Sequence, residues 1–316
     1  MDSTTVYWLD LREGGAVMKV PRAGGTAVRL APKEGPLNDI ALGAADLYWT
    51  VGPNDQGAVR RAPKDGGPPV TIAQAPGAFG IAVEGDHIYW SELTGTPASP
   101  YARHLVRAGL GGEGAVEIAS DVTWRFVVDE SHVYYGAASS KDLVKVPVTG
   151  GEVKVLARNA SAARLAEDAA NVYWWSSVDQ IAWRVSKAGG SPVRVTPAPV
   201  SGVMRLAVDA THLYLLGNTV ERVALASGTV TTTSLYTPGR GMGGIASDGL
   251  SVVWTAGFQN AFWGIATPGT CEGGSCSCPA GYVTCSGACV DPKTNPGTEI
   301  LCPGPEGGPV ATGSAG

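Results

Sequence analysis

The sequence predicts an all-β protein, a β-propeller built from four-stranded blades. Three observations predict this fold. A pair of aromatic residues recurs at intervals of roughly forty residues, and each interval holds four short apolar runs separated by turns. Glycine (44 residues) and proline (22 residues) are abundant in the 316-residue chain, while charged residues make up only 16%, which indicates many turns between short strands. Four strands in such a period match one propeller blade, whereas helical repeats need longer amphipathic segments without glycine.

The aromatic pair marks the second strand of each predicted blade. It stands at Tyr7-Trp8, Tyr48-Trp49, Tyr89-Trp90, Tyr134-Tyr135 and Tyr173-Trp174, with altered copies at Tyr214-Leu215 and Val253-Trp254. A core position must recur in every blade, whereas a ligand contact need not, so we expect the pair to pack between neighbouring blades. Seven copies favour a seven-bladed propeller, with a six-bladed one as the alternative.

The other strands of the repeat follow from the residues around this pair. The run before it, as in Val127-Val128-Asp129, is the predicted innermost strand, and its aspartate suits a turn in which the side chain bonds the backbone. The run after it contains a cation whose stem we expect to pack on the blade while its charged head stays in water. These cations are Lys19, Arg61, Arg107, Lys145, Arg184 and Arg222. Gly-Gly pairs then precede the fourth strand and suit a hairpin that needs positive φ angles.

The repeat resembles a known family. Tyr7-Trp8-Leu9-Asp10 and Leu47-Tyr48-Trp49-Thr50 look like the YWTD repeat of low-density-lipoprotein-receptor propellers. The whole unit is similar to the YWTD/TolB-like repeat proteins of bacteria, especially the secreted propellers of myxobacteria. This resemblance covers about residues 4–268 and implies the fold, but it says little about function. YWTD propellers have six blades, which is the reason for the six-bladed alternative.

A separate segment follows the predicted propeller of residues 1–268. All six cysteines fall in it: Cys271, Cys276, Cys278, Cys285, Cys289 and Cys302. An even number of close cysteines in a short Gly/Pro-rich segment predicts three disulfides and an oxidising compartment. A zinc site is the alternative, but the segment has no histidine and no Cys-x-x-Cys pair. We therefore expect a disulfide-rich module at residues 269–304, which resembles cysteine-rich modules beside bacterial propellers, and a flexible tail at 305–316.

Several classes of function are disfavoured by the sequence. A net charge of −5 with scattered signs gives no basic surface for nucleic acid, and no apolar run is long enough for a membrane span. No Gly-x-Ser-x-Gly, phosphate-loop, dinucleotide-binding or His-Glu-x-x-His motif is present, so we predict no catalytic residue, no metal ligand and no cofactor. Calcium stays open because acidic side chains at loop mouths supply oxygen ligands. The cysteines favour a secreted or cell-envelope protein, and since no export signal precedes the repeats, we expect a mature or trimmed form.

A candidate ligand site appears where the repeat breaks. The residue before the innermost strand reads Asp39, Gly80, Arg125, Arg164, Arg205 and Gly244 in successive blades. Three neighbouring arginines predict a cationic arc suited to a carboxylate, phosphate or sulfate. We expect Asp39 to pair with one of them or with a cation of the ligand, and Phe79 and Trp124 to supply a stacking surface. The alternative is structural: the arginines solvate the channel or pair with Asp39, Glu84, Asp129 and Asp168.

The leading hypothesis is therefore an extracytoplasmic binding propeller for a protein, a glycan or a small anion. The alternative is a propeller enzyme of the lyase or lactonase type, which would need convergent acids, amides or histidines where this chain has arginine and glycine. His87, His132 and His212 share one turn position, and His104 has no obvious acidic companion. A purely structural interaction module is a third hypothesis. The long loop from Ser91 to Tyr101 marks a further candidate contact.

Overall fold

We analysed a computed structural model of the chain. It describes residues 1–11, 14–22, 26–53, 56–94, 102–217, 219–228, 244–247 and 252–256, together with the backbone alone of strands β23 and β26–β30. The chain forms two compact units, one of residues 1–22 and 26–193 and one of residues 23–25 and 194–316. Each unit is described by itself below.

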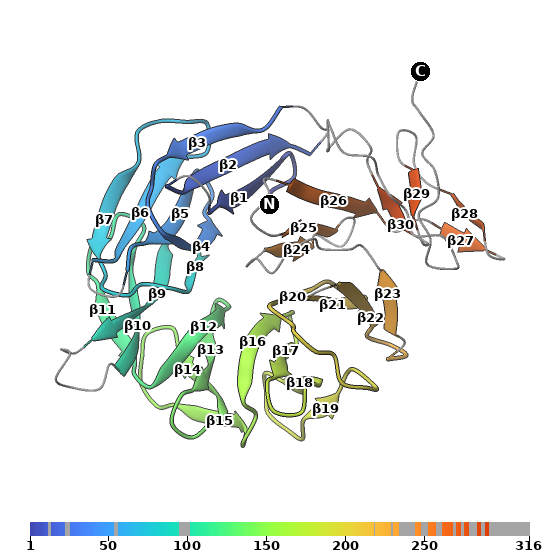
Figure 1. The fold of residues 1–316 in the computed structure, drawn as a ribbon. Coiled ribbons are helices and arrows are strands. Elements are labelled where there is room, and N and C mark those ends of the chain that lie inside the picture. The colour runs from blue at the N-terminus through green and yellow to red at the C-terminus, as the bar shows by residue number, and fades with distance from the viewer. Residues whose placement is uncertain are drawn as a thin grey trace. The chain divides into compact units, whose positions relative to one another are not determined.

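The first unit contains five antiparallel sheets in which strands follow one another in chain order (Figure 1). The first sheet has three strands, β1 (Thr5–Asp10), β2 (Ala16–Pro21) and β3 (Val28–Pro32). The second is β4 (Leu37–Leu42), β5 (Asp46–Val51), β6 (Ala58–Pro63) and β7 (Val70–Gln74), and the third is β8 (Ile81–Glu84), β9 (His87–Thr94), β10 (Ala102–Gly109) and β11 (Val116–Ala119). The fourth is β12 (Val122–Val128), β13 (His132–Ala137), β14 (Leu143–Pro147) and β15 (Lys154–Ala157), and the fifth is β16 (Ala162–Glu167), β17 (Asn171–Ser176), β18 (Ala182–Ser186) and β19 (Val193–Arg194), which ends at the unit boundary.

The second unit continues the same pattern. One sheet has the strands β20 (Arg205–Val208), β21 (His212–Leu216), β22 (Val220–Ala224) and β23 (Val230–Thr233). The next has five strands in the order β24 (Ile245–Ser247), β25 (Val252–Ala256), β26 (Ala261–Thr267), β30 (Ala288–Val290) and β29 (Val283–Cys285). A hairpin of β27 (Thr270–Glu272) and β28 (Ser275–Ser277) completes the described backbone.

These sheets are the blades of a β-propeller. In the first unit the leading strands β4, β8, β12 and β16 are innermost and contact one another in turn (Figure 1). Six of the described sheets have four or more strands, and the first has three. The expectation of seven complete blades is therefore wrong, and the six-bladed alternative applies. The aromatic pair Tyr7-Trp8 lies on β1, the leading strand of its sheet, so counting aromatic pairs adds one blade that lacks an innermost strand.

The aromatic pairs join neighbouring blades, as expected. Tyr48 of β5 packs in one buried cluster with Trp90 of β9, and Tyr134 of β13 packs with Trp174 of β17. Each of these four side chains is at most 2% exposed. The tyrosine of one blade thus meets the tryptophan of the next, and burying such large rings is a main source of stability between blades.

The aspartate after the innermost strand ties the turn to this aromatic core. Asp129 accepts hydrogen bonds from the backbone N–H groups of Ser131 and His132 through Oδ1 and from the Tyr134 hydroxyl, at 2.8 Å, through Oδ2. The same three contacts recur at Asp168 with Tyr173 and at Asp209 with Tyr214. This confirms the predicted turn, in which the backbone N–H of the residue at the histidine position donates to the aspartate whether that residue is histidine or asparagine.

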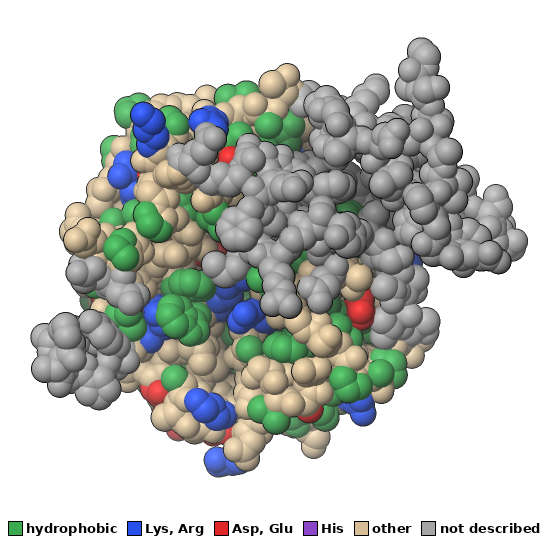
Figure 2. All heavy atoms as spheres, viewed as in Figure 1, with side chains coloured by type: hydrophobic (Ala, Val, Ile, Leu, Met, Phe, Trp, Pro, Cys, Tyr) green, Lys and Arg blue, Asp and Glu red, His purple; other side chains and the backbone are tan. Residues whose placement is uncertain are grey.

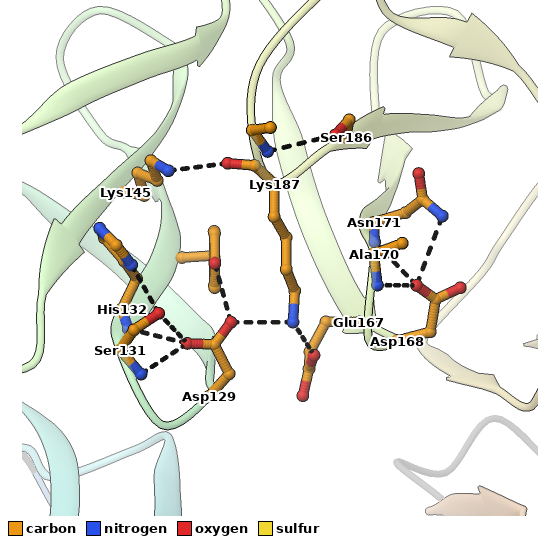
Figure 3. Close-up of polar contacts among 12 residues, drawn as sticks. Asp129, Ser131, His132, Lys145, Glu167, Asp168, Ala170, Asn171, Ser186 and Lys187 are labelled. Carbon is orange, nitrogen blue, oxygen red and sulfur yellow. Dashed lines mark hydrogen bonds and ion pairs between the residues drawn. The ribbon is translucent and has the colours of Figure 1, made fainter.

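Two lysines of the repeated cation position reach the next sheet, contrary to the expectation that their heads stay in water. Lys19 Nζ donates to the carbonyl of Lys64 at 2.8 Å, and Lys145 Nζ donates to the carbonyl of Lys187 at 2.7 Å. Carbonyl oxygens at these turns lie outside the sheet ladders, so the ammonium groups satisfy them. Lys187 in turn lies between Asp129 of the preceding blade, at 2.9 Å, and Glu167, at 2.5 Å (Figure 3).

Candidate functional site

The site residues of the first unit lie on innermost strands at places where the strand is irregular. The register of β4 against β5 shifts between Leu37 and Asp39. That of β12 shifts between Val122 and Phe126, and that of β16 between Ala162 and Arg164. A bulge bends the strand and turns side chains out of the regular alternation. These irregularities therefore set the directions of Asp39, Arg125 and Arg164.

Two buried hydroxyl groups fix the backbone of the site. The Thr50 hydroxyl accepts from the backbone N–H of Asp39 at 3.2 Å and donates to the carbonyl of Phe79 at 2.7 Å. The Ser91 hydroxyl accepts from the backbone N–H of Gly80 and donates to the carbonyl of Trp124, both at 3.1 Å. Both hydroxyl residues are fully buried. Each one links its own innermost strand to the next blade, so the site backbone has no free polar group here.

Gly80 occupies the position that holds arginine in other blades, and the structure gives the reason. A Cβ atom at this position would lie 2.7 Å from the carbonyl oxygen of Trp124 and 3.4 Å from the Cα atom of Arg125. The backbone of β12 passes too close for any side chain. The glycine thus brings Trp124 and Arg125 against the third blade.

Asp39 and Arg125 form an ion pair. Nη1 of Arg125 lies 2.5 Å from Oδ2 of Asp39, and the two side chains are 13% and 21% exposed. The guanidinium carbon of Arg125 also lies 5.1 Å from the ring centre of Phe79. Both the ligand-site hypothesis and its structural alternative include a pair between Asp39 and an arginine, so this ion pair fits each of them.

Arg164 lies within electrostatic reach of Arg125. Its pKa is lowered by burial and, in second place, by the positive charge of Arg125. Nη1 of Arg164 donates to the carbonyl of Ala163 at 2.8 Å. Within the described ranges, Nε of Arg164 and Nη2 of Arg125 are buried and have no hydrogen-bond partner. Two like charges are thus held close together with donors to spare.

Arg205 belongs to the second unit. It begins β20, and its Nη1 donates to the carbonyl of Met204 at 3.0 Å. The arc of three arginines therefore stays a prediction, and the site of the first unit contains Arg125 and Arg164.

The aromatic part of the site contains one residue that the sequence did not indicate. Phe79 and Trp124 meet edge to face, with ring centres 4.9 Å apart and planes at 71°. The guanidinium carbon of Arg103 lies 3.9 Å from the ring centre of Trp124. Arg103 follows the long loop of the third blade, and that insertion is the one signal in the sequence that points to it. Figure 2 shows basic side chains beside hydrophobic ones where the inner strands of the first unit meet.

Comparisons with known proteins agree on the fold. No protein-family model and no curated protein sequence matches the chain. Among solved structures, a chain of a nidogen/laminin complex matches with a TM-score of 0.56 and 17% identity, over 72% of this chain and 92% of that one. TolB from Acinetobacter baumannii matches with a TM-score of 0.53 and 11% identity, over 73% of this chain and 63% of TolB. The fold is a YWTD/TolB-like β-propeller. Virginiamycin B lyase from Staphylococcus aureus also matches, with a TM-score of 0.58 and 12% identity over 81% of this chain and 92% of the lyase.

The remaining candidate groups of the propeller can now be placed. His104 has an acidic companion after all, since its Nδ1 lies 2.7 Å from Oε2 of Glu117 on β11. His104 also pairs in register with Glu92, whose pKa is raised by burial.

In the described part of the chain, no group of three or more His, Cys, Asp or Glu side chains is placed to hold a metal ion. No described helix has the length and apolar character to cross a membrane. The side chains of the six cysteines lie outside the described residues, so their disulfides stay a prediction.

Proposed function

We propose that this chain is an extracytoplasmic binding propeller whose inner-strand site takes an anionic group of its ligand. The observation that carries the proposal is a pair of buried guanidinium N–H groups, Nη2 of Arg125 and Nε of Arg164, that have no hydrogen-bond partner among the residues that the structure describes. A buried donor without a partner is unfavourable, and an oxygen of a carboxylate, phosphate or sulfate is a suitable partner for either guanidinium group.

The charge balance supports an anion in particular. Asp39 is the acid paired with Arg125, and it neutralises one of the two neighbouring cations. Burial lowers the pKa of Arg164, which means that its charge is poorly compensated within the protein. Arginine nevertheless stays protonated at neutral pH, so the site keeps an excess positive charge.

Binding suits these residues better than lyase or lactonase chemistry does. General acid–base catalysis needs a group that exchanges protons near the working pH, and arginine does not. The likeness to virginiamycin B lyase, at 12% identity, concerns the fold. The ligand can be a protein, a glycan or a small anion, and the nidogen/laminin structure is a complex of proteins that contains a similar propeller. The expected disulfide module supports a location outside the cytoplasm.

Isothermal titration calorimetry at low salt with glutarate, phosphate and sulfate tests the proposal. We expect at least one of these anions to bind, and Arg125→Gln and Arg164→Gln each to weaken its affinity about 10-fold, since a hydrogen bond to a charged group contributes about 1.5–3 kcal/mol. Lys154→Gln on the outermost strand β15 makes the same charge change at an exposed position and should leave the affinity unchanged. Equal affinity in all four proteins, or no binding of any anion, would refute the proposal.

A further inference from the structure

Four side chains of the first unit form a continuous ladder of cations and rings. Arg103 lies over Trp124 at 3.9 Å, Trp124 meets Phe79 at 4.9 Å, and Arg125 lies beside Phe79 at 5.1 Å. Each distance is within the range of a favourable cation–π or aromatic contact. The contacts therefore run without a break from Arg103 through Trp124 and Phe79 to Arg125.

Arg103, at the other end of this ladder from Arg125, has no ion-pair partner among the described residues. Arg103 is 7% exposed, and burial alone lowers its pKa to about 10, which still leaves it charged at neutral pH. Nη1 donates to the carbonyl of Gly77 at 2.9 Å, whereas Nη2 is buried and has no partner in the described part of the chain. Taking an unpaired charge out of water is costly, and a ligand anion would offset this.

The ring between the two cations is open. Trp124 is 51% exposed, the largest exposed fraction among the described aromatic side chains of the site, although Arg103 covers part of it. An indole exposed to this extent provides a flat apolar platform on which an apolar face of a ligand can be buried. The site thus offers an exposed indole that is linked by ring and cation contacts to two guanidinium groups.

Two classes of ligand combine a flat face with anionic groups. A small aromatic acid needs an enclosed slot, because small-molecule sites bury most of the ligand surface. A chain of acidic sugars instead lies across a surface, stacks the C–H face of one ring on an exposed aromatic side chain, and presents a carboxylate on the neighbouring rings. The half-exposed Trp124 fits the second class.

Resting on the proposed function, we infer that the anionic ligand is an acidic oligosaccharide of uronic acid units. One sugar ring stacks on Trp124, and carboxylates of units on either side pair with Arg103 and with the Arg125–Arg164 pair. Asp39 is placed to accept a hydrogen bond from a sugar hydroxyl once Arg125 turns toward the ligand. Neutral oligosaccharides lack the charged groups and should bind weakly.

The experiment compares trigalacturonic acid, monomeric galacturonic acid and neutral maltotriose by calorimetry. We expect the acidic trimer to bind at least about 10-fold more tightly than the acidic monomer, and maltotriose to show no measurable binding. Trp124→Ala should remove the advantage of the trimer and leave monomer binding in place, while Trp124→Phe should keep most of it. Arg103→Gln should weaken the trimer alone. Val116→Ala, at an exposed apolar position on β11, is the control and should change nothing.

Each outcome separates this inference from the proposed function. If the monomer and glutarate bind through Arg125 but the trimer gains nothing, the site binds anions and the oligosaccharide is wrong. The same conclusion follows if Trp124→Ala leaves the trimer's advantage intact. If neither the trimer nor any small anion binds, both proposals fail together.

Discussion

At the residue scale, Asp39 and the proposed ligand use different donors of the same guanidinium group, Nη1 and Nη2 of Arg125. Asp39 holds Nη1 of Arg125 at 2.5 Å, and its negative charge lies where an incoming anion is proposed to bind. The carboxylate therefore acts both as a partner of Arg125 and as an opposing charge to the ligand. The balance between these two roles determines whether removing the charge of Asp39 strengthens or weakens anion binding.

Asp39→Asn should strengthen anion binding. The amide removes the opposing charge and keeps an oxygen for Arg125, so we expect the affinity for glutarate to rise several-fold at low salt, with a smaller gain at high salt because screening weakens the charge term. Calorimetry at two salt concentrations measures both effects. Weaker binding of the variant would show instead that Asp39 holds Arg125 in the binding geometry. Glu130→Gln, an exposed acid on the turn after β12, is the control.

At the same scale, the sequence identified the residues that break its own repeat. Asp39, Arg125 and Arg164 stood out because the innermost strands otherwise share a pattern, and the ion pair followed from their charges. Arg103 and the companion of His104 could not be found in this way, because both depend on how β10 lies against a neighbouring blade or strand. The roles of Lys19 and Lys145 were mistaken for the same reason, since their carbonyl partners are more than forty residues away.

At the scale of strands, the site depends on two hydroxyl groups that the aromatic repeat carries. Ser91 on β9 bonds both Gly80 on the innermost strand of its own blade and Trp124 on that of the next. The strands themselves were predicted well from the alternation of apolar runs and turns. The irregular registers of β4, β12 and β16 were not, because a bulge depends on the partner strand as much as on the bulged one.

Ser91→Ala should destabilise the protein by about 1–3 kcal/mol, because it leaves a buried N–H and a buried carbonyl without a partner. It should also weaken binding of the acidic trimer, since Trp124 loses a backbone contact. Urea denaturation followed by tryptophan fluorescence measures the first effect and calorimetry the second. Ser177→Ala, at an exposed position, should change neither. A loss of stability equal to that of the control would mean that the Ser91 contacts contribute nothing net.

Across the whole of the first unit, the blades are joined by a repeated set of contacts rather than by one large core. Tyrosine meets tryptophan across each junction described above, an aspartate holds the tyrosine hydroxyl, and lysines reach across to the next blade. The sequence predicted the aromatic part because it recurs. It failed on the number of complete blades because the first aromatic pair belongs to a sheet of three strands.

The junction between the sheet of strands β12–β15 and the sheet of strands β16–β19 should make the stability of the protein depend on pH. Burial acts to raise the pKa of Asp129, but hydrogen bonds from Lys187 and from the backbone of Ser131 and His132 outweigh it and hold this pKa well below its ordinary value. A lowered pKa means that the folded protein favours the charged carboxylate. The contribution of the Asp129 carboxylate to the free energy of unfolding is therefore fully present above the ordinary aspartate pKa, about 4. It is lost as the pH falls through the lower pKa that Asp129 has in the folded state. Glu167 has its pKa raised by burial despite its own bond to Lys187, so it protonates before Asp129 does.

Asp129→Asn should accordingly lower the free energy of unfolding near neutral pH by about 1–3 kcal/mol, through the lost charge-assisted bonds to Lys187 and the turn. The difference from the unmodified protein should shrink as the pH falls below about 4. Asp129 first protonates in the unfolded state near that pH, and at a lower pH it protonates in the folded state as well. Urea denaturation at a series of pH values measures it, with the neighbouring Glu130→Gln as a control that should show no such trend. A difference that stays constant with pH would mean that the shape of the aspartate, rather than its charge, holds the two blades together.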